Sequence, residues 1–231
     1  MLSKSLASLA LICFLFTLIW MVFMVWIEWE KGPFNTFPEV YQYVVQLDWK
    51  FYLSYINAVI LTLCVALFFT ALAKVLANVS KFWAFTGFIL IPLYCAINLF
   101  VYLSQITLVP HLVKAIGLNF YSPAVFFLQT RYIHLWREST VSIINIVGYS
   151  ILGITSIIYG ALLWKAFRNY RFSALLLAAN GVACIIGTCG ILLHSSIMQK
   201  GTIIGGIFFL LAQVPFFTGL VKNNPKMWRI K

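Results

Sequence analysis

The chain has 231 residues, of which 63% are hydrophobic and only 9% charged, and its mean hydropathy is +0.97. This composition is far too apolar for a soluble domain and predicts one polytopic membrane domain over residues 1–231. The formal net charge of +11 could suggest a nucleic-acid partner. We expect none, because the basic residues are segregated along the chain in the way that a bilayer requires.

Six stretches are apolar for the roughly 20 residues that are needed to cross about 30 Å of hydrocarbon. They cover about residues 5–27, 51–73, 82–109, 141–164, 172–193 and 201–221. In lipid, backbone groups must be hydrogen-bonded within the segment, so these spans are predicted to be helices. The first reads as an uncleaved anchor, since no small-x-small cleavage site follows its long apolar core. The predicted fold is an all-α integral membrane protein with a six-helix bundle.

Charges between the spans predict the orientation. If the N-terminus is inside, one side receives ten basic residues and no acid: Lys4, Lys74, Lys81, Lys165, Arg168, Arg171, Lys222, Lys226, Arg229 and Lys231. The other side receives six basic residues and all five acids, Glu28, Glu30, Glu39, Asp48 and Glu138. The positive-inside rule then places both termini in the cytoplasm, most simply at the plasma membrane. The basic side is expected to meet anionic lipid headgroups.

Short inner connections predict that spans two and three, and spans four and five, are antiparallel neighbours. The outer connections are longer, and residues 40–47 in the first could lie along the membrane surface. In the second, residues 110–140, a helix starting near Pro123 would have an apolar face and a polar face. The apolar face would hold Val125, Leu128, Tyr132 and Leu135, and the polar face an outer cluster of Arg131, His134 and Glu138. This pattern is typical of an interfacial amphipathic helix, or of a partly re-entrant one.

Polar and small residues recur at helical spacing in three spans. Span three has Tyr94, Asn98, Tyr102 and Gln105, span four has Ser142, Asn145, Tyr149, Gly153, Ser156 and Gly160, and span five has Asn180 with His194 at its outer end. Such stripes either let helices pack closely or line a ligand site. Because amide groups cannot face acyl chains, spans three and four should face one another or a common space.

Two outcomes are open for this stripe. If it is packing, its polar groups will satisfy one another. If it is a site for a small neutral or lipid-like ligand, they will line a cavity of about 300 Å³ or more. The expected ligand-binding residues are Tyr94, Asn98, Tyr102, Gln105, Ser142, Asn145, Tyr149, Asn180 and His194. In the predicted topology most of this polar content falls in the outer half of the membrane, which favours an outward opening.

Motifs for other chemistry are missing. His111, His134 and His194 lie near the outer side with the acids, but no H-x-x-x-H or H-E-x-x-H spacing is present, so no metal or cofactor is expected. The sequence also lacks a G-x-S-x-G, a P-loop and a C-x-x-C. The spans hold no ionisable acid or base, which disfavours proton-coupled carriers.

The favoured function is non-enzymatic binding of a small neutral or lipid-like molecule, as a sensor, scaffold or accessory subunit. A membrane-protein partner or a second copy of the chain would fit such a role. One alternative is a transporter that uses the stripe as its path, for which an inverted three-plus-three repeat of the spans is topologically allowed. The other is a membrane-embedded enzyme with a site at His134, Glu138 and His194.

Overall fold

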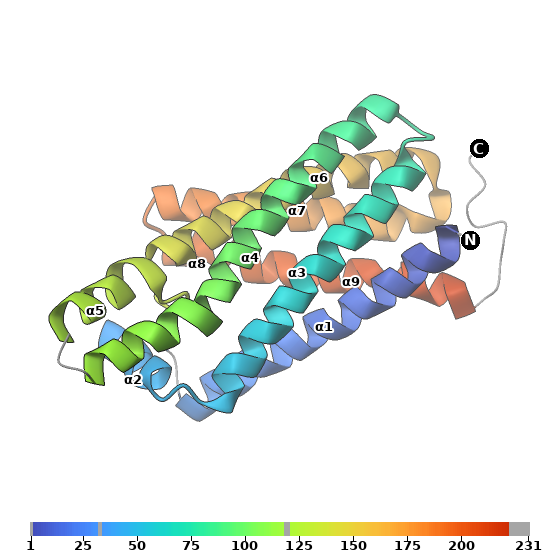
Figure 1. Ribbon diagram of the computed structural model, residues 1–231. Helices are drawn as coiled ribbons and strands as arrows, with labels where there is room; N and C mark the ends of the chain where they lie inside the picture. The colour runs from blue at the N-terminus through green and yellow to red at the C-terminus, as the bar shows by residue number, and fades with distance from the viewer. Residues whose placement is uncertain (1, 32–33, 118–120, 222–231) are drawn as a thin grey trace. The chain divides into compact units, whose positions relative to one another are not determined.

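A computed structural model describes residues 2–31, 34–117 and 121–221, which form helices and short connections without a strand in those ranges (Figure 1). In chain order the α-helices are α1 (Leu2–Lys31), α2 (Phe37–Val45), α3 (Trp49–Leu76), α4 (Lys81–Gly117), α5 (Tyr121–Phe127), α6 (Thr140–Ala166), α7 (Arg171–Leu192), α8 (Ser196–Gln199) and α9 (Gly201–Val221). A π-helical turn, η1 (Leu128–Tyr132), follows α5, and a 3₁₀ turn, η2 (Arg168–Tyr170), precedes α7.

Six of these helices, α1, α3, α4, α6, α7 and α9, are long and apolar enough to cross a membrane. The prediction of an all-helical chain with six candidate spans is therefore confirmed. The helix ends agree with the predicted ones to within a few residues, except that α4 continues past Pro110 to Gly117. The basic residues Lys222, Lys226, Arg229 and Lys231 lie outside the described residues.

Contacts along the chain define two compact units. Unit 1 comprises residues 1–17, 63–95 and 146–231, and unit 2 comprises residues 18–62 and 96–145. The boundaries between the units fall inside α1, α3, α4 and near the start of α6. The units are therefore joined by continuous helices, and the assignment to one domain stays a prediction.

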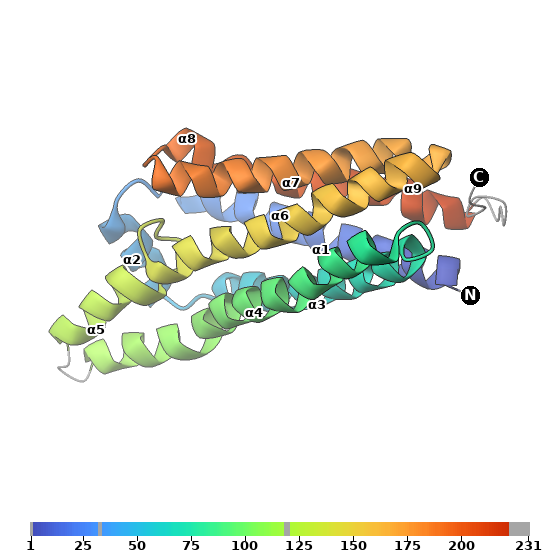
Figure 2. The ribbon, with the colours of Figure 1, turned by 90° about the horizontal axis from the view of Figure 1, so that it is seen from above.

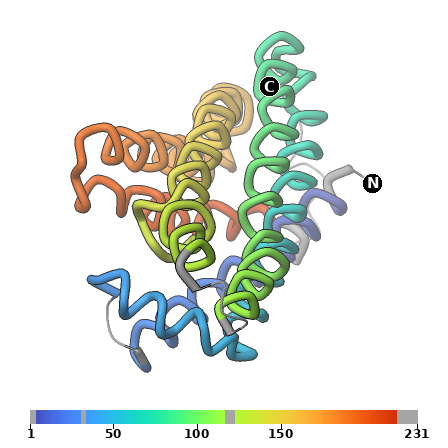
Figure 3. Tube along the Cα trace, turned by 60° about the vertical axis from the view of Figure 1, so that its left-hand side comes forward, coloured from blue at the N-terminus to red at the C-terminus, as the bar shows by residue number. Residues whose placement is uncertain are grey.

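In unit 1, glycines let helices α6, α7 and α9 approach closely. A Cβ on Gly153 of α6 would lie 2.9 Å from the carbonyl oxygen of Gly181 in α7. One on Gly205 of α9 would lie 2.8 Å from Cys184 Sγ in α7. Figure 3 shows the orange trace of α7 beside the red trace of α9. Small residues in these spans serve close packing, as their spacing allows.

Helices α4 and α6 also meet in unit 1, through hydroxyl groups that donate to backbone carbonyls. Thr155 Oγ1 donates to Gly87 O over 3.1 Å, and Tyr159 Oη donates to Ala84 O over 3.0 Å. The rings of Tyr94 and Tyr149 lie 6.0 Å apart. The prediction that spans three and four face one another is confirmed for this unit.

In unit 2, helix α2 packs its apolar face on the neighbouring helices. Its buried residues Val40, Tyr43 and Val44 join a core with residues of α3, α4 and η1. The carboxylate of Glu39 accepts hydrogen bonds from the backbone N–H groups of Asn35 and Thr36, which lowers its pKa and marks the start of α2. Figures 1 and 2 show α5 beside the end of α4, running in the opposite direction.

The prediction for the helix that begins near Pro123 is corrected at its C-terminal end. This helix was expected to carry Arg131, His134 and Glu138 on one face. It ends at Tyr132 in the π-helical turn, and Ile133 is extended, with φ −75° and ψ 107°. Leu128 is fully buried, as the apolar face required. His134 and Glu138 lie beyond the helix, so they do not share a helical face with Arg131.

Candidate functional site

His134 lies at the centre of a polar cluster in unit 2. Its ring Nδ1 is 3.3 Å from Tyr55 Oη of α3, and its Nε2 is 2.9 Å from Asn145 Nδ2 of α6. Its backbone N–H donates to Gln105 Oε1 of α4 over 3.1 Å. One residue in a connection therefore joins three candidate spans through hydrogen bonds.

The amide of Gln105 fixes the connection that carries His134. Its Nε2 donates to the carbonyl oxygen of Tyr132 over 2.6 Å, while its Oε1 accepts from His134 N–H. Both backbone groups lie where the helix stops, so the side chain satisfies groups that a continuing helix would have bonded internally. Gln105 is fully buried. This contact is the physical reason that the helical face predicted through His134 does not form.

Two tyrosine rings contact the imidazole of His134. The ring centroid of His134 lies 5.7 Å from that of Tyr55 and 5.6 Å from that of Tyr102, both in edge-to-face geometry. Both tyrosines are buried, whereas His134 keeps partial exposure. Such edge-to-face contacts stabilise aromatic clusters by about 0.5–1.5 kcal/mol each beyond their buried area.

The cluster is uncharged at neutral pH. Burial lowers the pKa of His134 to about 4, so its imidazole is neutral and offers one donor and one acceptor. Arg131 and Glu138 are exposed, and Arg131 Nη1 donates to Thr140 Oγ1 over 3.3 Å. Asn145 Oδ1 is buried, and no hydrogen bond from the described part of the chain reaches it.

The predicted ligand-binding residues are found in both units. In unit 2, Tyr102, Gln105 and Asn145 come together around His134. Asn98 is fully buried. The backbone N–H of Ser142 donates to Ser139 Oγ over 3.2 Å.

The remaining predicted residues belong to unit 1. Tyr94 and Tyr149 contact one another, and Asn180 Nδ2 donates to Ser156 Oγ over 2.9 Å. His194 follows α7 with a φ of 50° and is exposed. These residues therefore make contacts of their own within unit 1, and a ligand site formed by the nine positions stays a prediction.

Sequence reasoning missed Tyr55 and Ser139. Ser139 Oγ donates to Ile133 O over 2.6 Å and accepts from Ser142 N–H, as an N-cap of α6 does. Its place directly before an apolar span was a signal that could have been used. No sequence pattern indicated Tyr55, because its phenol meets His134 only in the folded protein.

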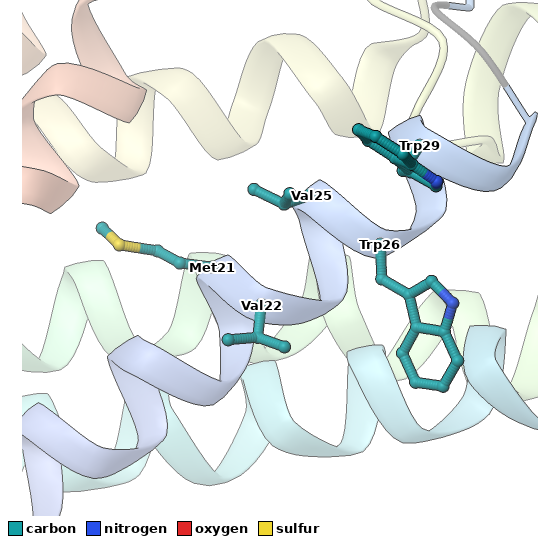
Figure 4. A pocket seen from close by; sticks show the side chains of 5 residues that line it. All are labelled: Met21, Val22, Val25, Trp26 and Trp29. Carbon is teal, nitrogen blue, oxygen red and sulfur yellow. The ribbon is translucent and has the colours of Figure 1, made fainter.

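The described surface includes one groove along α1 and another between α3 and α4. One of about 370 Å³ follows α1, where Met21, Val25 and Trp29 point to one side and Val22 and Trp26 to the other (Figure 4). The second, of about 500 Å³, lies between α3 and α4 in unit 1. Neither groove is lined by a predicted ligand-binding residue. The first presents aliphatic and indole groups, which suit acyl chains.

Within the described ranges, no three His, Cys, Asp or Glu residues converge as metal ligands would. No known family model matches the sequence, and no curated protein or solved structure matches it either.

Proposed function

We propose that the chain is a non-enzymatic multi-pass membrane protein that binds a small neutral or lipid-like molecule at the His134 cluster, from the outer side. The observation that carries the proposal is the buried Asn145 Oδ1, for which the described residues supply no donor. A buried acceptor without a donor costs about 1–3 kcal/mol. A hydroxyl or amide N–H of a ligand would remove that cost.

The neutral groups of the cluster favour an uncharged ligand. The imidazole, two phenols and two amides around this point are all neutral at pH 7. A charged ligand would lose its hydration here without gaining a counter-charge, which is costly in a low-dielectric setting. The neighbouring rings of Tyr55 and Tyr102 instead suit an apolar body with one polar group.

The proposal includes the orientation. Both termini would lie in the cytoplasm at the plasma membrane, with residues 121–139 at the outer interface. The basic residues of the inner side would meet anionic headgroups. Ligand binding would bias the packing of α3, α4 and α6, as a sensor, a scaffold or an accessory subunit of another membrane protein requires.

Cysteine labelling tests whether the cluster is reachable. Asn145→Cys is made in a background in which the five native cysteines are replaced, and cells are treated with a membrane-impermeant maleimide. We expect labelling from outside that is slower than at exposed Gln129→Cys. Buried Ala183→Cys provides the unreactive control. If Asn145→Cys folds but stays unlabelled, the proposal of a reachable ligand site is wrong and the cluster serves helix packing.

The ligand class is tested by photocrosslinking with two diazirine lipids, a neutral diacylglycerol and an anionic phosphatidylglycerol. We expect the neutral probe to label peptides within residues 128–145, and Asn145→Leu to reduce this labelling. Equal labelling of this region by the anionic probe would contradict the assignment of a neutral ligand.

A further inference from the structure

The α3–α4 hairpin of unit 1 has a groove whose lining is apolar apart from Thr70 and two lysines near the turn. Its volume is about 500 Å³. It is lined by Thr70, Ala73 and Lys74 of α3, by Ala77 just after α3, and by Lys81, Ala84, Phe85 and Phe88 of α4. All these residues belong to unit 1. The groove shares no residue with the His134 cluster, so variants can test the two sites separately.

Both walls of the groove use the same helical pattern. The lining positions follow the spacing i, i+3, i+4, i+7 from Thr70 to Ala77, one residue past the end of α3, and again on α4, which places each set on one face. Three of these positions are alanines, whose small side chains leave space in the groove. Phe85 and Phe88 are exposed and supply an aromatic wall.

The polar and apolar ends of the groove are ordered along the hairpin. Lys74 lies in the last turn of α3, and Lys81 is the first residue of α4, so both ammonium groups belong to the end near the connecting turn. Phe88 lies about two turns further into α4. The groove is therefore amphiphilic along its length, with cations at one end and aromatic rings at the other.

Unit 1 has no acidic side chain that could neutralise these lysines. All five acids of the chain fall in the residue ranges of unit 2, and none occurs between Asp48 and Glu138. An ion pair between Lys50 and Glu30 is also in unit 2. Lys74 and Lys81 are both exposed and so can reach an external anion.

We propose that this groove is a binding site for an anionic phospholipid. Lys74 and Lys81 hold the phosphate of the headgroup near the turn, and an acyl chain lies over Ala73, Ala84 and the ring of Phe85. Charge complementarity identifies the anion, and each lysine near a membrane surface contributes appreciably to such binding. The apolar floor and the position of the groove on two candidate spans identify a lipid rather than a soluble phosphate.

The test is retention of lipid by the full chain. The protein is reconstituted in nanodiscs of equal parts phosphatidylcholine and phosphatidylglycerol, released, and examined by native mass spectrometry. We expect the wild type to retain phosphatidylglycerol in preference to phosphatidylcholine. The double variant Lys74→Gln and Lys81→Gln should lower that preference roughly tenfold.

A matched control removes two other exposed basic residues, with Lys165→Gln and Arg168→Gln, and should keep the preference. Equal loss in both double variants would show that only general surface charge is involved, and would overturn the site. Ala77→Phe keeps both lysines but fills the groove, and should also reduce retention. If Ala77→Phe retains as much lipid as the wild type, the acyl chain has no role in binding. The same conclusion follows if soluble glycerol 3-phosphate displaces the lipid completely.

Discussion

His134 shows how a residue's surroundings decide its chemistry. In the sequence it has one-turn spacing to Glu138 and three-residue spacing to Arg131, which predicts a position on a charged helix face. In the structure its ring contacts the rings of two tyrosines and bonds to Asn145. Burial then holds the ring neutral, and the cluster selects for neutral partners.

The lowered pKa of His134 predicts a pH dependence of stability. In the unfolded chain the imidazole binds a proton near pH 6.5, but in the folded protein it does so only near pH 4. Stability should therefore fall as the pH drops from about 6.5 to about 4, by at most about 3 kcal/mol from this group. Thermal unfolding in detergent across this range should show a shallower pH dependence for His134→Asn. An equally steep dependence in the variant would show that the imidazole is not responsible.

Gln105 gives a second prediction at this scale. Gln105→Leu keeps the approximate size of the side chain but leaves Tyr132 O and His134 N–H without the partners they have in the wild type. We expect a loss of about 1–3 kcal/mol for each unsatisfied group, measured as a lower unfolding temperature. Gln129→Leu, at an exposed position, is the control and should change little. If both variants unfold alike, the amide of Gln105 does not fix the connection.

At the scale of elements, the stripes of small and polar residues divide into two uses. In unit 1 the glycines of α6, α7 and α9 allow close contact, and hydroxyls donate across helices to backbone carbonyls. In unit 2 the amides of α4 and α6 bond to the connection between them. Residues three and four positions apart therefore form packing contacts in unit 1 and a polar cluster in unit 2.

Gly153→Ala should separate α6 from α7, because the new methyl would lie 2.9 Å from the backbone oxygen of Gly181. The backbone cannot yield as a side chain would, and we expect about 1–3 kcal/mol of destabilisation. Ala161→Leu adds more volume to α6 at an exposed position and should cost little. The unfolding temperatures of both variants test this, and a larger loss in Ala161→Leu would contradict the assignment of Gly153 to a helix contact.

At the scale of the whole molecule, the distribution of charge is the dominant feature. The acids are confined to the residue ranges of unit 2, and the described part of unit 1 carries basic residues without an acid. Such segregation is typical of the positive-inside rule.

The orientation is tested with reporters fused after Lys231 and inserted after Asn35. The first should be active only in the cytoplasm, since ten of the sixteen basic residues are assigned to that side. The second should be active only outside. A C-terminal reporter that is active outside would mean that the number of crossings is odd.

The sequence by itself determined the six long apolar helices. Roughly 20 apolar residues are needed to span a bilayer and must be helical there, so length and hydropathy were sufficient for α6, α7 and α9. The same rule predicted that Asn98 and Gln105 turn inward, and both are fully buried.

Only the tertiary structure decided which groups meet. The helix predicted through His134 stops at Tyr132 because a side chain from α4, far away in the sequence, supplies hydrogen bonds at that point. Tyr55 joins His134 across 79 residues, and no local spacing encodes that contact. Periodicity reports the face on which a residue lies, whereas the partner on that face depends on the packing of other helices.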